Sequence, residues 1–144
     1  MGTFFIIAII AFVIFVMVQL TDTSPAECIT YNYKGLYLGD DSSFEMRPVT
    51  TSFSIQNKFI TINTPFAEPI KMRILKNDVH SKANVYTCMD GHRNQHIIIR
   101  SKMNDVRLDA IMIAHAGFYE IYSNNQNFKE DLDKVYSLYN LFDL

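Results

Sequence analysis

The sequence of 144 residues is poor in several residue types on which common protein functions depend. It has only two cysteines, so at most one disulfide can form within the chain, which excludes the disulfide-dense class of small secreted scaffolds. Its five glycines are scattered, and they form no glycine-rich loop of the kind that holds phosphate in nucleotide-binding proteins. No Asn-x-Ser/Thr acceptor for N-glycosylation is present either. These absences leave the hydrophobic pattern as the main source of information.

Charged residues are missing before Asp22, and an apolar run interrupted only by Gln19 occupies residues 4–20 (FFIIAIIAFVIFVMVQL). As a helix with a rise of about 1.5 Å per residue, this run would reach roughly 26 Å, close to the ~30 Å hydrocarbon core of a bilayer. We therefore expect residues 1–20 to form a single-pass transmembrane signal anchor or an uncleaved signal peptide. The membrane, reached through residues 4–20, is the first expected partner.

The residues on either side of the run bear on whether it is kept. Met1, Gly2 and Thr3 lack the basic side chains that usually open a signal peptide, which favours retention. Ser24 and Ala26 nevertheless supply the small residues of a cut before Glu27, and a chain cut there would be secreted. We expect retention, with the rest of the chain on the extracytoplasmic side.

The remainder divides into a short linker, residues 21–27, and one domain, residues 28–144. The whole chain has a formal net charge of −2, which gives no electrostatic reason to expect a nucleic-acid partner. The chain lacks tryptophan but has 8 tyrosines and 11 phenylalanines, a composition that suits a β-rich core.

Short β-branched and aromatic segments alternate with turn residues throughout the first three quarters of this domain. Asp90-Gly91, for example, lies between two apolar segments and predicts a β-hairpin. Regular alternation from Val106 to Ala114 predicts the longest strand. We expect about eight antiparallel strands in a small barrel or sandwich. The segments are residues 29–33, 35–38, 51–55, 59–63, 70–75, 85–89, 96–100, 106–114 and 118–122.

The hydrophobic period changes in the last segment of the chain. Phe128, Leu132 and Val135 begin a series of apolar residues spaced three or four apart, with charged residues between them. This spacing predicts an amphipathic helix over residues 127–142, with Asn127 as its N-cap and one face packed on the sheet.

Five strand segments together resemble a small β-rich protein type found in gut Bacteroidetes and their phages. The resemblance covers residues 53–123, and that type often has a second cysteine where this chain has His96. No activity is implied by the resemblance, so no functional residue carries over from it. The segments are KFITI (58–62), IKMRI (70–74), VYTCMDG (85–91), HIIIR (96–100) and FYEIY (118–122).

Cys28 opens the domain and Cys88 lies near its middle. In an oxidising compartment the pair would close a loop of about 60 residues and stabilise the fold by roughly 4 kcal/mol. In a reducing compartment both would be small buried hydrophobic residues. We predict a Cys28–Cys88 disulfide, since we expect the domain to lie outside the cytoplasm.

The sharpest chemical pattern is Cys88-x3-His92-x3-His96, and the fold could bring His80 and His115 close to it. Sulfur and imidazole nitrogen are the ligands that zinc prefers, so these three residues are the metal candidates. On a hairpin, however, strand register decides whether Cys88 and His96 share a face, and a structural cysteine beside solvent-facing histidines explains the pattern as well. We predict no cofactor and no catalytic residue.

These observations favour a membrane-tethered β-domain that acts as a non-enzymatic binding module for an unidentified protein partner near the bilayer. One alternative is an accessory subunit of a membrane protein complex, with its apolar helix packed against other spans. The other is a secreted hydrolase or metal-dependent enzyme that uses Cys88, His92 and His96.

Overall fold

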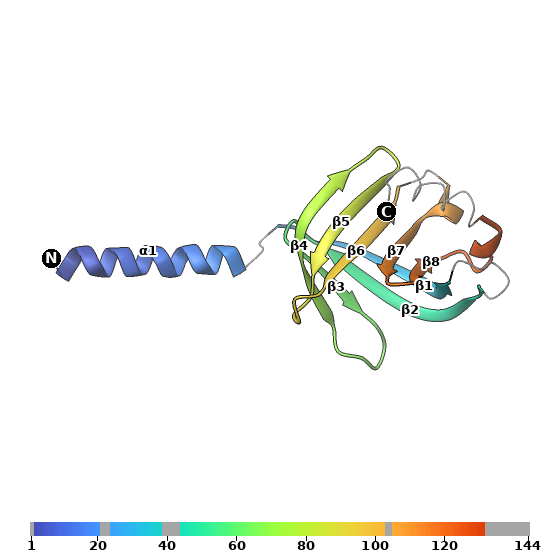
Figure 1. The fold of residues 1–144 in the computed structure, drawn as a ribbon, viewed down its shortest axis with the longest axis horizontal. Coiled ribbons are helices and arrows are strands. Elements are labelled where there is room, and N and C mark those ends of the chain that lie inside the picture. Colours follow the sequence, from blue (N-terminus) through green and yellow to red (C-terminus); the bar gives the residue numbers. More distant parts are fainter. Residues whose placement is uncertain (1, 21–23, 39–43, 103–104, 132–144) are drawn as a thin grey trace.

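The computed structural model describes residues 2–20, 24–38, 44–102 and 105–131, with the side chains of 17–20 outside the description. The chain begins with helix α1 (Gly2–Leu20) and continues into eight strands (Figure 1). The strands are β1 (Glu27–Tyr37), β2 (Met46–Ile55), β3 (Phe59–Asn63), β4 (Ile70–Val79), β5 (Ala83–Met89), β6 (Gln95–Ser101), β7 (Ala110–His115) and β8 (Phe118–Ser123). A short 3-10 turn, η1 (Val106–Leu108), precedes β7.

The eight strands form a closed antiparallel barrel in which each strand pairs with its neighbours in the sequence. The barrel closes because β1 pairs with β8 as well as with β2, with Lys34 opposite Tyr122 and Gly35 opposite Ile121. Closure gives each described strand a partner on both sides, although short β3 pairs with only residues 52–55 of β2 and residues 70–73 of β4. The predicted mainly-β antiparallel fold is confirmed, and its form is a barrel rather than a sandwich.

Several predicted strand boundaries were wrong: β2 starts at Met46 and not at residue 51, β4 continues to Val79 and not only to residue 75, and two further differences have clear causes. Residues 29–33 and 35–38 were expected as separate strands, but β1 runs continuously through Gly35. The predicted strand over 106–114 starts only at Ala110, because the Asp105 side chain accepts a hydrogen bond from the backbone nitrogen of Arg107 and the backbone turns into η1. Alternating apolar residues at 106 and 108 therefore reflect one tight turn and not strand pairing.

Strand alternation divides the apolar residues between the barrel interior and its outer face. The interior cluster receives residues from all eight strands, and Phe53 and Ile98 at its centre are fully buried. A second buried cluster lies on the other face of the sheet, where Met112 and Ile121 pack with Phe128. Both faces of β7 are therefore buried, which explains its continuous apolar sequence from Ala110 to Ile113.

The terminal helix is described only at its start. Residues 128–131 are helical, and Phe128 is completely buried in the outer cluster, as expected for a helix that packs on the sheet. At this start, Asn125 Oδ1 accepts a hydrogen bond from the backbone nitrogen of Asn127, and the Asn127 carbonyl accepts one from the backbone nitrogen of Glu130. The rest of the predicted helix 127–142 lies outside the described residues.

Gly35 is required where β1 passes beneath two outer side chains. A β-carbon at this position would lie 2.7 Å from Met46 Sδ and 2.7 Å from Phe44 Cε2. Both distances are shorter than van der Waals contact, so any side chain at position 35 would push Phe44 and Met46 out of the outer cluster.

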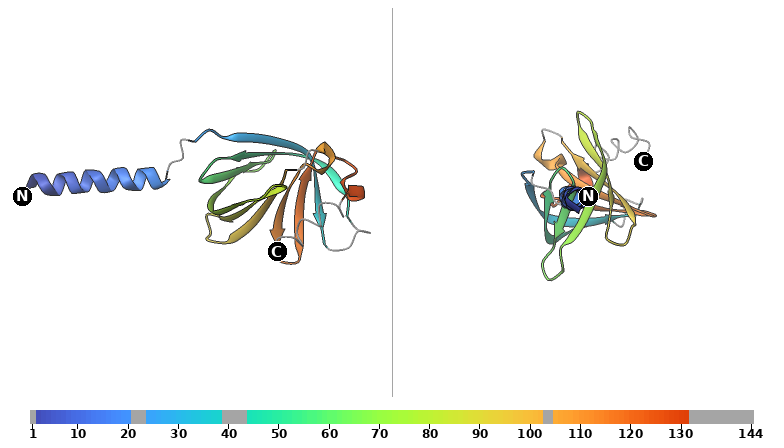
Figure 2. Two further views of the ribbon diagram at one scale, coloured as in Figure 1. Left: turned by 90° about the horizontal axis from the view of Figure 1, so that it is seen from above. Right: turned by 90° about the vertical axis from the view of Figure 1, so that its left-hand side faces the viewer.

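Helix α1 stands apart from the barrel as a straight rod (Figures 1 and 2). Its described side chains are almost all exposed, including Phe4 at 85% and Phe12 at 67%. None of the helices in the described residues reaches the length and hydrophobicity required of a membrane span.

The linker meets the barrel at the turn between β2 and β3. The Ser24 carbonyl accepts a hydrogen bond from Gln56 Nε2 at 3.0 Å, and Ser24 Oγ accepts one from the backbone nitrogen of Asn57 at 3.1 Å. Strand β1 then begins at Glu27, the last residue of the predicted linker and one residue before the predicted start of the domain.

Candidate functional site

Polar side chains enter the barrel interior at both of its ends, and we name each end by its residues. The arginine end contains Glu27, Tyr31, Arg100 and Asp109. The histidine end contains Lys34, Asp90, His96, His115, Glu120 and Tyr122. The apolar centre around Phe53 and Ile98 separates the two groups.

At the arginine end most polar groups are paired with one another, although the buried Arg100 Nε makes no hydrogen bond to any described residue. Arg100 donates through Nη1 and Nη2 to the two carboxylate oxygens of Glu27, both at 2.6 Å. This paired contact lowers the pKa of Glu27 and raises the pKa of Arg100. The Tyr31 hydroxyl donates to Asp109 Oδ1 at 2.9 Å, and burial raises the pKa of Tyr31. The contacts link β1 to β6 and to the start of β7, so this end has a structural role.

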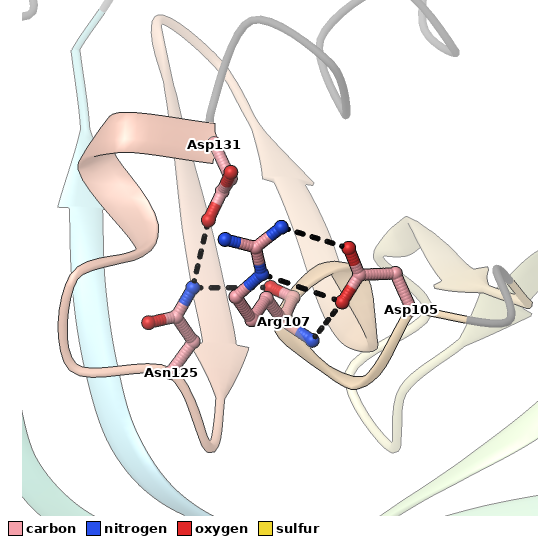
Figure 3. Close-up of polar contacts among 4 residues, drawn as sticks. All are labelled: Asp105, Arg107, Asn125 and Asp131. Atoms are coloured by element: carbon pink, nitrogen blue, oxygen red, sulfur yellow. Dashed lines mark hydrogen bonds and ion pairs between the residues drawn. The ribbon is translucent and has the colours of Figure 1, made fainter.

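A further polar cluster joins η1 to the start of the terminal helix (Figure 3). Arg107 Nη2 donates to Asp105 Oδ2 at 3.1 Å, and Asn125 Nδ2 donates both to the Arg107 carbonyl at 3.2 Å and to Asp131 Oδ2 at 3.1 Å. Each carboxylate already accepts a hydrogen bond, so the cluster holds two segments together and is not a candidate site.

At the histidine end, Asp90 and His96 form the first of two polar groups. His96 Nε2 lies 2.9 Å from Asp90 Oδ2, while Asp90 Oδ1 accepts hydrogen bonds from the backbone nitrogens of His92 at 2.8 Å and Asn94 at 2.9 Å. The His96 hydrogen bond and these backbone donors lower the pKa of Asp90 to about 2. Asp90 therefore stays ionised and holds both the hairpin turn and the His96 ring.

Glu120 is the centre of the second polar group. Tyr122 donates its hydroxyl to Glu120 Oε2 at 2.9 Å, and Lys34 Nζ lies 3.7 Å from Glu120 Oε1. His115 Nε2 also lies 3.6 Å from Glu120 Oε1, but it is buried and makes no hydrogen bond to any described residue. The His115 ring is stacked on Phe118, with ring centroids 4.6 Å apart. A buried nitrogen without a hydrogen bond costs free energy, and a ligand group hydrogen-bonded to it would recover that cost.

These groups surround a cavity of about 280 Å³ at the histidine end. One side of it is apolar, and the other carries the lysine, the carboxylates and the two imidazoles. This combination of an apolar wall and a few converging polar groups is typical of small-molecule sites. The lining residues are Lys34, Ile62, Thr64, Ile70, Met72, Asp90, Ile113, Tyr122, His96, His115 and Glu120.

The structure places the three metal candidates as follows. Cys88 and His96 are direct cross-strand partners on β5 and β6, so register puts them on the same face. His92 lies exposed in the hairpin turn, away from that face, and His80 lies in the turn between β4 and β5. Within residues 2–20, 24–38, 44–102 and 105–131, no three His, Cys, Asp or Glu side chains are grouped so that they could hold a metal ion. Burial also raises the pKa of the Cys88 thiol to about 12, so it is protonated at neutral pH and is a poor nucleophile.

The predicted Cys28–Cys88 disulfide was wrong. Both thiols are free, with Cys28 exposed and Cys88 buried. Cys28 pairs with Ser54 on β2, whereas Cys88 lies on β5 inside the barrel and pairs with His96. Strands β1 and β5 are four strands apart around the barrel, and the two thiols lie on opposite sheet faces, so the sulfur atoms are kept apart.

We expect a thiol reagent to distinguish the two cysteines. In the folded full chain, a maleimide should label Cys28 within minutes and leave Cys88 unlabelled, because Cys88 is buried and its thiolate is scarce. Adding denaturant should then expose the second thiol, and mass spectrometry would count one and two labels respectively. A chain that takes up no label until it is reduced would contradict this arrangement.

The sequence pattern indicated only part of this site. His96 and His115 were noted as candidates, and Asp90 was recognised as a turn residue. Lys34, Glu120 and Tyr122 were missed as site residues, although the alternation in FYEIY does place Glu120 and Tyr122 on one face. Alternation does not show which face points into the barrel.

A comparison of the chain with protein-family models, with curated proteins and with solved structures finds no match. The functional argument therefore depends on the geometry of the chain itself.

Proposed function

We propose that this chain is a membrane-tethered, non-enzymatic binding module whose β-barrel takes a small ligand in the histidine-end cavity. The observation that carries the proposal is the cavity itself, with an apolar wall of Ile62, Ile70 and Met72 facing the polar side chains of Glu120 and His115. Eight-stranded barrels are wide enough to enclose one small ligand, and they bind it at the mouth.

The tether is supported by the apolar run and by the exposure of α1. The 19 residues of α1 reach about 28 Å at a rise of about 1.5 Å per residue. Apolar side chains as exposed as Phe4 and Phe12 favour transfer out of water, since each Å² buried contributes roughly 25 cal/mol. We propose that α1 enters the bilayer as a single-pass anchor and that the barrel lies on the extracytoplasmic side.

The anchor would act by holding the barrel at the membrane surface. The linker joins the barrel at the arginine end, where Ser24 contacts Gln56 and Asn57, and the cavity opens at the other end. Confining the barrel to the membrane surface raises the effective concentration of its binding site for anything present there.

Binding is favoured over catalysis by the state of the polar groups. Asp90 is held by three hydrogen bonds, and Cys88 belongs to the interior apolar cluster, with its pKa raised to about 12. Cys88 lies opposite His96 in the β5–β6 register, but its buried and protonated thiol is a poor nucleophile. The accessory-subunit alternative uses the same exposed α1 and differs in placing other spans against it.

A cavity-filling substitution tests the binding site. Ile70 lines the cavity but is 51% exposed, so Ile70→Trp should fill the space without disturbing the core. We expect small fragments that bind the full chain in lipid nanodiscs, detected by ligand-observed NMR, to lose at least about tenfold in affinity. Val79→Trp, on the same strand and also exposed, is the matched control and should bind fragments normally.

Two results would count against the proposal. Fragments that bind the Ile70→Trp chain as well as the parent would place the site elsewhere. A parent chain that binds no fragment would remove the small-ligand function itself.

A further inference from the structure

Next to the cavity lies a groove of about 340 Å³ on the face of β1 and β2 that carries Lys34. Lys34 lines both spaces, so the groove adjoins the cavity. Leu36 and Leu38 in the groove are 50% and 61% exposed, an uncommon position for two leucines on one strand face. The groove is lined by Lys34, Gly35, Leu36, Leu38, Glu45, Arg47 and Val49.

Two cations meet in this groove. Lys34 and Arg47 are direct cross-strand partners in the β1–β2 pairing, so their side chains share one face. Like charges placed directly opposite each other destabilise a strand pair. Lys34 has Glu120 at 3.7 Å, whereas Arg47 makes no ion pair or side-chain hydrogen bond with any residue the structure describes.

The remaining charge of the groove is Glu45, on the same strand face as Arg47. Because Lys34 is paired with Glu120, the groove has no net excess of charge, and Arg47 is the cation in it without an ion pair to a described residue, beside the exposed side chains of Leu36, Leu38 and Val49. A guanidinium forms two parallel hydrogen bonds with a carboxylate, which makes Arg47 the stronger anchor of the pair.

From this arrangement we infer that the groove binds a single-chain anionic amphiphile, with its carboxylate at Arg47 and Lys34 and its alkyl chain along Leu36, Leu38 and Val49. The inference rests on the proposed binding function and names the class of its ligand. Bound there, the carboxylate supplies the counter-ion that Arg47 lacks, and the alkyl chain covers the exposed leucines.

The ligand is a free amphiphile and not a headgroup within the bilayer. Strand β1 leads from the linker at Glu27 to Lys34, seven residues on, which is about 23 Å at roughly 3.3 Å per residue. The groove thus lies a strand's length from the point where the anchor joins the barrel.

The test uses the full chain in zwitterionic lipid nanodiscs, with dodecanoate and dodecanol as probes and empty nanodiscs as the blank. We expect calorimetry to show dodecanoate binding that Arg47→Met weakens by about tenfold, while dodecanol binding changes little. Arg47→Met keeps the apolar stem and removes only the charge. Arg73→Met on β4, away from the groove, is the matched control and should leave both affinities unchanged.

The other outcomes separate this inference from the proposed function. If Ile70→Trp abolishes dodecanoate binding and Arg47→Met does not, the cavity is the ligand site and the groove inference is wrong. If Arg47→Met reduces attachment to anionic vesicles and leaves dodecanoate binding intact, Arg47 binds lipid headgroups of the bilayer. The inference is then also wrong. A dimer in the nanodisc that Arg47→Met dissociates would assign the groove to a second copy of the chain.

Discussion

The full chain should remain in the membrane pellet after alkaline carbonate extraction, and two aspartates placed in α1 should release it. An aspartate at the centre of a spanning helix costs roughly 2.5–3.5 kcal/mol, so the double change Ile9→Asp and Phe12→Asp should cost about twice that. Both side chains are exposed in α1, so the barrel loses nothing by their replacement. Immunoblotting of pellet and supernatant would measure the partition.

The matched control introduces the same charges on the barrel surface. Phe66→Asp and Val106→Asp replace two exposed apolar residues outside α1, and this chain should stay in the pellet. A parent chain recovered in the soluble fraction with Glu27 as its first residue would instead show that the apolar run is a cleaved signal, and the tether would be wrong.

Phe53→Ala should destabilise the barrel by about 3–5 kcal/mol, the usual cost of removing a buried aromatic ring. Phe53 is fully buried at the centre of the interior cluster. Its ring meets Tyr122 edge-on with centroids 5.0 Å apart and Tyr31 with centroids 6.0 Å apart, so the change leaves a cavity between strands that close the barrel. Thermal unfolding followed by near-ultraviolet circular dichroism should show a melting temperature lower by roughly 10 °C or more.

Phe66→Ala is the control for this substitution, because Phe66 is fully exposed in the turn between β3 and β4. Its replacement should shift the melting temperature by no more than about 2 °C, since surface substitutions usually stay within ±0.5 kcal/mol. Equal effects of the two substitutions would mean that Phe53 does not lie in the core.

Local patterns predicted the strands well where one sheet face is apolar and the other polar. The hairpin around Asp90-Gly91 was recognised because its two residues mark a turn and its flanks pair symmetrically, from Ala83 opposite Ser101 to Met89 opposite Gln95. The prediction of a strand that begins at Val106 was wrong because apolar residues two apart also suit a short 3-10 turn. The Asp105 side chain accepts a hydrogen bond from the backbone nitrogen of Arg107, and this contact favours the turn over the strand. Alternation of apolar residues does not reveal such a contact.

The candidate site was less predictable because its residues come from distant strands. Lys34 and Glu120 lie 86 positions apart, and they meet only because β1 pairs with β8. The predicted disulfide was wrong for a different reason. Spacing allowed a bond between Cys28 and Cys88, but their opposite faces and distant strands prevent one.

The sequence by itself determined the apolar helix, the antiparallel strand order and the turns, because hydrophobic period and turn chemistry act over a few neighbouring residues. Only the tertiary structure decided that the sheet closes into a barrel, that Cys88 is buried and that Lys34 and Arg47 share a groove. Closure depends on the register between the first and last strands. That register follows from the summed packing of the interior, in which every strand takes part, and no single segment contains it.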